Sequence, residues 1–300
     1  LDEHYDYDTR YARAEEHVQV VQGLWQSYED DAFPRDRASG RFLDPTKLHA
    51  LNHKGNHFSV VGPLNIQRSP QGQPVIFQAG DSEQGRALGA ATADVVFTHA
   101  ASIEQGQAFY RDIKHRAARL GRDPEQLLVL PGAEIYVGDN DAHAREIERH
   151  YHQADHSFEL ALKEFGRNFG WHDFSQYDLD APFPQESLAF ARSSFFTNAK
   201  RIADQARDKA FSLRQAVEFG RQLRPGAFVG SAETVAAKMA EWFEARALDG
   251  FNIYIGHPGQ FRRFTEEVVP LLQARGVYRT AYEGTTLRES LGLPIPRSGR

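Results

Sequence analysis

The chain contains no cysteine and only one methionine, Met239. The lack of cysteine excludes disulfides, zinc–thiolate sites and a cysteine nucleophile from this chain. Long apolar runs are also missing, because no stretch approaches the roughly 18 apolar residues that a membrane-spanning helix needs. The first residues, Leu1–His4, have neither a basic start nor an apolar core. We therefore expect no secretory signal and a cytoplasmic protein.

An excess of basic residues is absent too. Lys and Arg number 35 against 41 Asp and Glu, which gives a formal net charge of -6. A nucleic-acid-binding protein usually carries a basic surplus or stripe, so we expect no nucleic-acid partner. The hydrophobic share of 41% and the charged share of 25% are those of an ordinary globular protein. The aromatic share of 12% suits a protein with deep apolar walls.

Helix-like and strand-like segments alternate along most of the chain. Apolar residues at helical spacing predict a helix over residues 8–25. Residues 26–73 lose this periodicity and are rich in Asp, Pro, Gly and Asn, which is typical of a functional loop or an inserted segment. Within them we predict a hairpin in which 57–61 pairs with 64–66 across Gly62–Pro63.

Four buried parallel strands are expected after this segment, because continuous β-branched and aromatic runs each precede a helical pattern. They lie near Val75, Val95, Leu127 and Phe251, and Pro131–Gly132 interrupts the third. The helices expected between and after them cover 81–91, 102–120, 141–165, 186–219, 231–245 and 258–275. Such α/β units make an open sheet or half of an eight-stranded (β/α)8 barrel.

The main candidate site is the turn from the first of these strands into its helix, Gln78–Arg86. Gly80 lets the backbone approach a ligand, and the free N–H groups of a first helical turn attract an anion. The Ser82 hydroxyl adds a donor, so the turn suits a phosphate. The same residues also fit a plain helix cap, with Asp81 or Ser82 as the N-cap and Gln84 completing a capping box. The residues alone leave both interpretations open.

Two other kinds of site have weaker support. Gly80–Ser82 is similar to the nucleophile string of a GDS-type serine hydrolase, a mechanism that needs a histidine base with an orienting acid. His257 follows the last expected strand, but no Asp-x-x-His string precedes it. His152 and His156 could share a metal on one helix face, yet no third ligand is evident and a solvated face is favoured. GxGxxG and Walker A strings are absent.

Tyr7 and Tyr11 are one helical turn apart near the start of the first expected helix. A phenol there can donate a hydrogen bond to a phosphate or to a ring carbonyl. Tyr11 could equally be a core residue with a polar tip, and the residues alone do not decide between these roles.

The segment Asp6–Glu16, DYDTRYARAEE, resembles the HDERYxRAEE segment of the luciferase-like flavin monooxygenases. The closest branch is the nitrilotriacetate, dibenzothiophene-sulfone and long-chain alkane monooxygenase group. Further strings of this family follow in the same order over nearly the whole chain, namely WQSYEDD at 25–31, DPTKLH at 44–49, HKG at 53–55, GPLN at 62–65, QGQPVIFQAG at 71–80, the segment 230–235 and DGFN at 249–252. Each string is weak alone, and together they are specific.

The resemblance implies a (β/α)8 TIM-barrel-like, luciferase-like fold, with 1–300 as a single domain and 26–73 as an insertion. It implies a two-component monooxygenase that uses O2 and reduced FMN on a small organic substrate. A separate NAD(P)H:flavin reductase would supply the reduced FMN, and a homo-oligomer is expected because relatives form dimers and tetramers. In this family the strand–helix turn binds the flavin phosphate and the tyrosine segment contacts the cofactor. The implied cofactor-binding residues are Tyr7, Tyr11, Ala79, Gly80, Asp81 and Ser82.

Two residues depart from the family pattern. Tyr7 replaces the usual histidine, and a phenol cannot carry a positive charge at neutral pH. Asp81 replaces a residue that is commonly neutral, and a carboxylate that faced a phosphate would be repelled. We therefore expect the Asp81 side chain to turn outward while its N–H points at the anion.

In the family, the strands that carry much of the substrate pocket and the catalytic histidine come before the tyrosine segment. We therefore expect an incomplete barrel that lacks the first three or four strands, and the catalytic residues of this chain are unknown. Its open edges should promote self-association. The chain would be a fragment of an intact enzyme or a non-catalytic remnant that binds no productive flavin. The substrate and the preference for FMN over another flavin are not readable from the residues.

Overall fold

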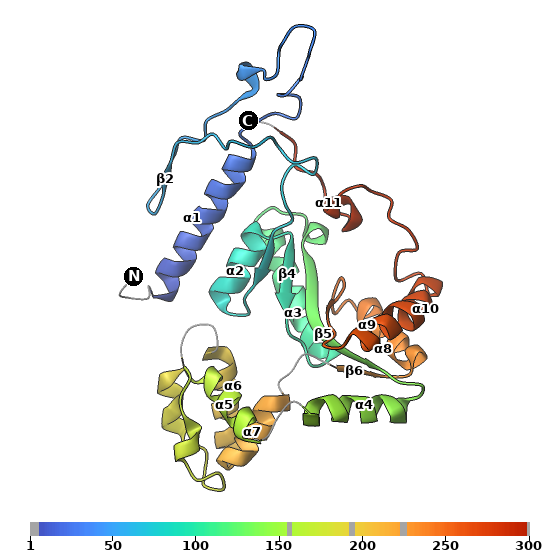
Figure 1. Cartoon of the computed structure of the whole chain (residues 1–300). Helices are drawn as coiled ribbons and strands as arrows, with labels where there is room; N and C mark the ends of the chain where they lie inside the picture. The colour runs from blue at the N-terminus through green and yellow to red at the C-terminus, as the bar shows by residue number, and fades with distance from the viewer. Residues whose placement is uncertain (1–5, 155–157, 192–195, 223–226, 299–300) are drawn as a thin grey trace.

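The computed structural model describes residues 6–154, 158–191, 196–222 and 227–298, and Figure 1 shows the path of the chain. Helix α1, Tyr7–Trp25, begins at the N-cap Asp6, whose carboxylate accepts a hydrogen bond from the Thr9 N–H at 2.8 Å. This confirms the helix expected over 8–25. Within the described ranges, no helix combines the length and the apolar character that crossing a bilayer requires.

The segment that follows α1 is mostly irregular. It contains the short 3-10 helix η1, Pro45–Lys47, and an antiparallel hairpin of β1, His53–Lys54, and β2, Ser59–Val60. The predicted pairing of 57–61 with 64–66 is therefore wrong. The strand inside 57–61 pairs with the residues before it.

A carboxylate on α1 explains this choice of partner. Glu16 accepts hydrogen bonds from the His53 ring at 2.9 Å and from the N–H groups of His57 and Phe58 at 2.9 and 2.8 Å. Partial burial alone would raise the pKa of Glu16, but these hydrogen bonds outweigh it and lower the pKa to about 2. The ionised carboxylate thus fastens the hairpin turn to α1.

Five strands of the described chain form a parallel sheet at the centre of the structure (Figure 1). They are β3, Phe77–Ala79; β4, Val95–Thr98; β5, Leu128–Val137; β6, Ala227–Gly230; and β7, Asn252–Tyr254. β3 pairs with β4, β4 with β5, and β5 with both β6 and β7. Four strands match the expected ones, whereas β6 is a fifth that the sequence analysis does not predict.

The long strand β5 continues through Pro131–Gly132, where the sequence predicts an interruption. Pro131 stands opposite Thr98 at the end of the ladder with β4, and Gly132 stands opposite Asn252 at the start of the ladder with β7. The missing N–H of the proline therefore falls where one ladder ends, and the strand tolerates it there.

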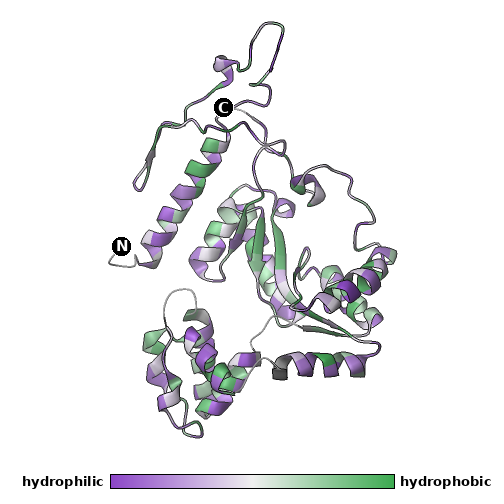
Figure 2. Ribbon diagram, viewed as in Figure 1, coloured by the Kyte–Doolittle hydropathy of each residue, from purple (hydrophilic) through white to green (hydrophobic). Residues whose placement is uncertain are grey.

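Helices cover one face of the sheet. α2, Glu83–Thr92, and α3, Ile103–Arg119, share a core with β4, and α8, Ala232–Glu244, shares one with the second half of β5. Figure 2 shows the central strands as largely hydrophobic, as this burial requires. The side chains at most 4% exposed include Val96, Ile113, Val129, Ile135, Val235 and Met239.

The opposite face of the sheet is open in the described chain. Phe77 on β3 and Tyr254 on β7 are each 50% exposed, and Ala79 is exposed as well. The expectation that the first strand is buried is therefore wrong for the face that carries Phe77 and Ala79. α2 packs over the Gln78 side of β3, and the described residues leave the Phe77 side uncovered. Among the residues that the structure describes, the sheet is not closed into a barrel.

The chain between β5 and β6 is helical, and its helices are shorter than predicted. Ala210 has a positive φ of 50° just after α6, a conformation that a helix cannot continue through, so the helix predicted over 186–219 is divided. The helix predicted over 141–165 is α4 and α5, with 155–157 outside the described residues. The elements are α4, Asp141–Ala154; α5, Phe158–Asn168; η3, Phe174–Gln176; η4, Gln185–Phe190; α6, Phe196–Asp208; and α7, Leu213–Gln222.

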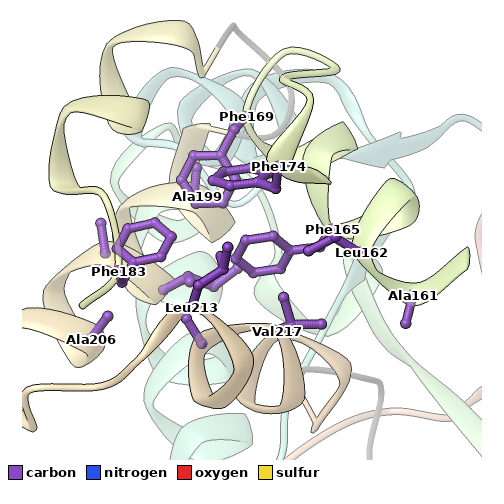
Figure 3. Packing of buried hydrophobic residues seen from close by; sticks show 13 residues of the cluster. Ala161, Leu162, Phe165, Phe169, Phe174, Phe183, Ala199, Ala206, Leu213 and Val217 are labelled. Atoms are coloured by element: carbon purple, nitrogen blue, oxygen red, sulfur yellow. The ribbon is translucent and has the colours of Figure 1, made fainter. Parts of the chain in front are cut away.

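Elements α5 to α7 have a core of their own, apart from the sheet. Figure 3 shows phenylalanine rings from α5 and the loops after it lying between the helices. Phe169 and Phe174 are 0% and 1% exposed, and their ring centroids are 5.3 Å apart in an edge-to-face contact. Such pairs add to the apolar burial that holds small helical units together.

The C-terminal part returns to the sheet. α9, Pro258–Arg263, a π-helical turn η6, Phe264–Val268, and α10, Val269–Ala274, form the helix expected over 258–275. The remaining elements are the 3-10 turn η2, Pro124–Gln126, and α11, Leu287–Ser290. Arg288 of α11 is 3% exposed and donates to Asp94 at 2.6 Å, which ties the tail to the start of β4.

Candidate functional site

The turn between β3 and α2 is the candidate site, and its centre is the N-cap of α2. Ser82 is that N-cap, and its Oγ accepts a hydrogen bond from the Gly85 N–H at 3.1 Å. The N–H groups of Glu83 and Gln84 in the first turn have no acceptor among the described residues. Of the two caps that the sequence allows, the structure uses Ser82. The positive end of α2 therefore faces outward with free donors, which favours an anion.

A second hydroxyl reaches this turn from a distant segment. α1 packs against α2, and the Tyr11 hydroxyl lies 3.3 Å from Ser82 Oγ, within hydrogen-bond distance. This contact joins residues 71 positions apart in sequence and favours the polar role of Tyr11 over the core role. Tyr7 is the first residue of α1, and its side chain lies outside the described part of the structure.

Two glycines, Gly80 and Gly85, allow the close backbone contact in this turn. A Cβ on Gly85 would lie 2.8 Å from the Gly80 carbonyl oxygen, so the two backbones touch and no larger residue fits. A Cβ on Gly80 would lie 2.8 Å from Gln78 Nε2 and 3.5 Å from the Tyr11 hydroxyl. The space beside Gly80 is therefore lined by two polar groups. Gln78 Oε1 is buried and has no hydrogen-bond partner among the described residues.

Asp81 does not take the orientation that the sequence analysis expects. Its Oδ1 accepts a hydrogen bond from the Thr98 hydroxyl at 2.9 Å, and Thr98 is 2% exposed at the end of β4. The carboxylate therefore turns inward, toward the neighbouring strand, because a buried hydroxyl there needs an acceptor. Its backbone carbonyl accepts from Arg86 Nε at 3.0 Å, which fixes the other side of the residue.

Two arginines beside the turn are paired with carboxylates. Arg86 and Arg116 contact Asp112 of α3 at 3.0 and 2.9 Å, and Arg116 also binds Glu83 at 2.6 Å. Burial opposes ionisation of Asp112, but the hydrogen bonds from Arg116 and Arg86 outweigh it and lower its pKa. Hydrogen bonds from Arg116 likewise lower the pKa of Glu83. These paired charges hold α2 on α3, and the free N–H groups remain the main attraction for an anion.

An aromatic wall lies next to this turn on the open face of the sheet. Ala79 stands opposite Phe97 in the β3–β4 ladder, and the Phe97 ring centroid is 6.4 Å from that of Tyr254 and 4.9 Å from that of His99. Phe77, at the start of β3, is exposed on the same face as Ala79. The arrangement can hold a flat aromatic ring with an anionic tail, because apolar walls and convergent donors lie side by side.

Three residues at this site, Gly85, Thr98 and His99, do not stand out as site residues in the sequence. Gly85 carries the clearest signal, because a glycine inside the first turn of a helix has a cost that close packing would explain. His99 directly follows a buried strand, and strand ends are where parallel sheets carry their sites. Thr98 has no signal in the sequence, since its role depends on the pairing of β3 with β4.

The other sites considered from the sequence are not assembled. The hydrogen-bond partners of Ser82 Oγ among the described residues are the Tyr11 hydroxyl and the Gly85 N–H, with no imidazole. His257 instead caps α9, where its Nδ1 accepts from the Gly259 N–H at 3.2 Å. The side chain of His152 and the whole of His156 lie outside the described residues. Within the described ranges, no three His, Asp or Glu residues are grouped to hold a metal ion.

Comparison with known proteins gives one consistent result. Residues 2–249 match the family model described as luciferase-like monooxygenase. The chain is 42% identical over 299 residues to N-acetyl-S-(2-succino)cysteine monooxygenase of Bacillus subtilis, covering 98% of this chain and 67% of that protein. It is 40% identical over 300 residues to nitrilotriacetate monooxygenase component A of Aminobacter aminovorans, covering 99% and 65%.

A solved structure agrees with these sequence matches. The structure of a riboflavin lyase with modified FMN and riboflavin superposes with a TM-score of 0.79 and 29% identity, covering 98% of this chain and 64% of that one. The chain thus spans about two thirds of the length of the relatives that it matches. The α/β fold class predicted from the resemblance is confirmed, and within the described residues the sheet remains open.

Proposed function

The chain belongs to the luciferase-like monooxygenase family, and from this premise we propose that it binds FMN through the turn between β3 and α2. The activity we propose is oxygenation of a small organic substrate with O2. A separate flavin reductase would supply the FMN in reduced form. The named relatives act on an aminopolycarboxylate and on a thioether-containing amino acid, so a small polar organic acid is the substrate class we favour.

One observation carries the proposal. The Ser82 hydroxyl, the Tyr11 hydroxyl and the free N–H groups of Glu83 and Gln84 converge at the N-terminus of α2. A phosphate accepts hydrogen bonds at all of its terminal oxygens, and a helix N-terminus favours its negative charge. The Asp81 carboxylate does not occupy these donors, since it is directed toward Thr98. The Asp8 carboxylate also lies at this helix start, where it accepts from Gln84 Nε2 at 3.3 Å.

The residues present fit FMN in two further respects. The space beside Gly80 is lined by Gln78 Nε2 and the Tyr11 hydroxyl, and a Cβ at that position would fill it. The rings of Phe77, Phe97 and Tyr254 offer an apolar surface to an aromatic ring system. FMN in its reduced form supplies the electrons that activate O2.

The role we propose for this chain in the reaction is to bind and position FMN. Ser82 and Tyr11 would hold the phosphate end, and the β3 and β4 aromatics would exclude water from one side of the ring. No described residue is assigned as a general acid or base. We propose that the chain forms a homo-oligomer and receives reduced flavin from a separate reductase.

The experiment is a titration of the purified chain with FMN, followed by quenching of flavin fluorescence. We expect Ser82→Ala to weaken FMN binding by about tenfold, because a charge-assisted hydrogen bond is lost. The matched control is Ser102→Ala, which removes the N-cap of α3. Both variants lose a cap worth about 1 kcal/mol, so a difference in FMN affinity reports the site rather than the fold.

The outcome separates the alternatives. Absence of FMN binding by the folded chain would favour a non-catalytic remnant of this fold. Equal weakening by Ser82→Ala and Ser102→Ala would mean that FMN binds elsewhere. A burst of product from an activated ester, abolished by Ser82→Ala, would revive the serine hydrolase.

A further inference from the structure

We propose that Thr98 is a positioning residue of the anion site: its hydroxyl holds the Asp81 carboxylate away from the first turn of α2 and so keeps that turn open to a phosphate. This inference rests on the proposed function, and it concerns how the chain selects a phosphorylated flavin. It makes the end of β4 a determinant of what binds at the end of β3.

The geometry of the pair is well defined. Thr98 Oγ1 lies 2.9 Å from Asp81 Oδ1, and a carboxylate can only accept, so the threonine hydroxyl is the donor. Thr98 is the last residue of β4 and is 2% exposed, so its hydroxyl is fixed by the sheet and shielded from water. On the other side, Arg86 Nε holds the Asp81 carbonyl at 3.0 Å. The acidic side chain is therefore held between two neighbouring elements.

The alternative position for this carboxylate is the site itself. Asp81 directly precedes the N-cap of α2, and the nearby N–H groups of Glu83 and Gln84 have no described acceptor. An aspartate beside a helix start readily accepts hydrogen bonds from first-turn N–H groups. A carboxylate in that position would occupy the donors that a phosphate needs. It would also repel the phosphate charge.

Loss of the Thr98 hydroxyl should therefore matter for one class of ligand only. FMN and riboflavin share the ring system and the ribityl chain and differ by the phosphate. A carboxylate released into the turn would weaken FMN binding and leave riboflavin binding nearly unchanged. A general disturbance of the fold would weaken both.

The experiment compares FMN and riboflavin affinities by fluorescence titration of the full chain and four variants. Thr98→Val removes the hydroxyl at constant volume, and Thr98→Ser retains it. Asp81→Ala removes the carboxylate, and the fourth variant combines Asp81→Ala with Thr98→Val. Thermal unfolding of each variant checks that it is folded.

We expect Thr98→Val to lower FMN affinity by about tenfold, the effect of one charge-assisted hydrogen bond, with riboflavin affinity changed less than about twofold. Thr98→Ser should keep FMN affinity near that of the original chain. In the Asp81→Ala background, Thr98→Val should have no further effect on FMN, because no carboxylate remains to be released.

Two results would overturn the inference while leaving the proposed function intact. One is an equal loss of FMN and riboflavin affinity in Thr98→Val, and the other is a loss of FMN affinity that persists with Asp81→Ala. If the unaltered chain binds FMN no more tightly than riboflavin, both the inference and the phosphate site fail. If it binds neither flavin, the proposed function fails with them.

Discussion

Two consecutive strand–helix units of the same sheet, β3–α2 and β4–α3, begin their helices in nearly the same way. Ser82 caps α2 by accepting from the N–H of Gly85 at 3.1 Å, and Ser102 caps α3 by accepting from the N–H of Gln105 at 3.3 Å. In both helices the donor is the third helical residue. The local chemistry of the two caps is therefore the same.

The units differ in what surrounds the cap. In α3 the Gln105 side chain reaches back and accepts from the Ala101 N–H at 3.3 Å, so that unit satisfies one more donor with its own side chain. In α2 the corresponding residue, Gly85, has no side chain and lies against Gly80, while Tyr11 approaches from α1. A serine cap becomes a candidate site only where glycines leave room and a distant segment adds a donor.

The largest effect that this comparison predicts is at the third helical residue. Gly85→Ala should reduce FMN affinity by more than tenfold and lower the melting temperature. The new Cβ would lie 2.8 Å from the Gly80 carbonyl oxygen, and overpacking of this kind costs about 1–3 kcal/mol. Gln105→Ala, the matched change in α3, should leave FMN affinity unchanged. FMN titration and thermal unfolding of both variants test this, and equal FMN affinities would contradict the comparison.

A smaller effect is expected at the donor that only α2 receives. Tyr11→Phe should lower FMN affinity about fivefold, the value of one ordinary hydrogen bond, with little change in stability. The control is Tyr110→Phe on α3, whose hydroxyl donates to Asp249 at 3.0 Å. Burial and the nearby Asp249 charge raise the pKa of Tyr110 to about 12, so this hydroxyl is a structural donor.

Tyr110→Phe should therefore reduce the free energy of unfolding and leave FMN affinity unchanged. The same pair of measurements, titration and unfolding, separates the two tyrosines. A Tyr11→Phe variant that loses stability but keeps its FMN affinity would show that Tyr11 is a core residue.

The smallest predicted effect is on thermal stability, through the contact of Glu16 on α1 with the β1–β2 hairpin. The pKa of Glu16 is lowered to about 2 from a usual value of 4.5, so its ionised form stabilises the folded chain. That contribution is complete above pH 4.5 and is lost as the pH falls toward 2. We expect the melting temperature of Glu16→Gln to lie below that of the original chain at pH 7, with a gap that narrows below pH 4.5. A gap independent of pH would exclude this role of the carboxylate.

Much of the β3–α2 unit could be predicted from its residues, because its signals are local. The strand and a helix start at Asp81 or Ser82 follow from glycine, serine and helical spacing, and the same residues predict a turn that favours an anion. The strand β6 was not predicted in this way, and its place in the sheet is set by the ladder with β5. The hairpin pairing was predicted wrongly because Glu16, a residue of α1, decides it.

By itself, the sequence determined the alternation of strands and helices, the turn that starts α2 and the family to which the chain belongs. These depend on short-range periodicity, on backbone preferences and on residue order. Only the tertiary structure decided that Tyr11 reaches Ser82 and that Asp81 turns toward Thr98. Each of these contacts joins segments that the fold, and not the local chain, brings together, and hydrogen bonds and steric contacts act only over a few ångströms.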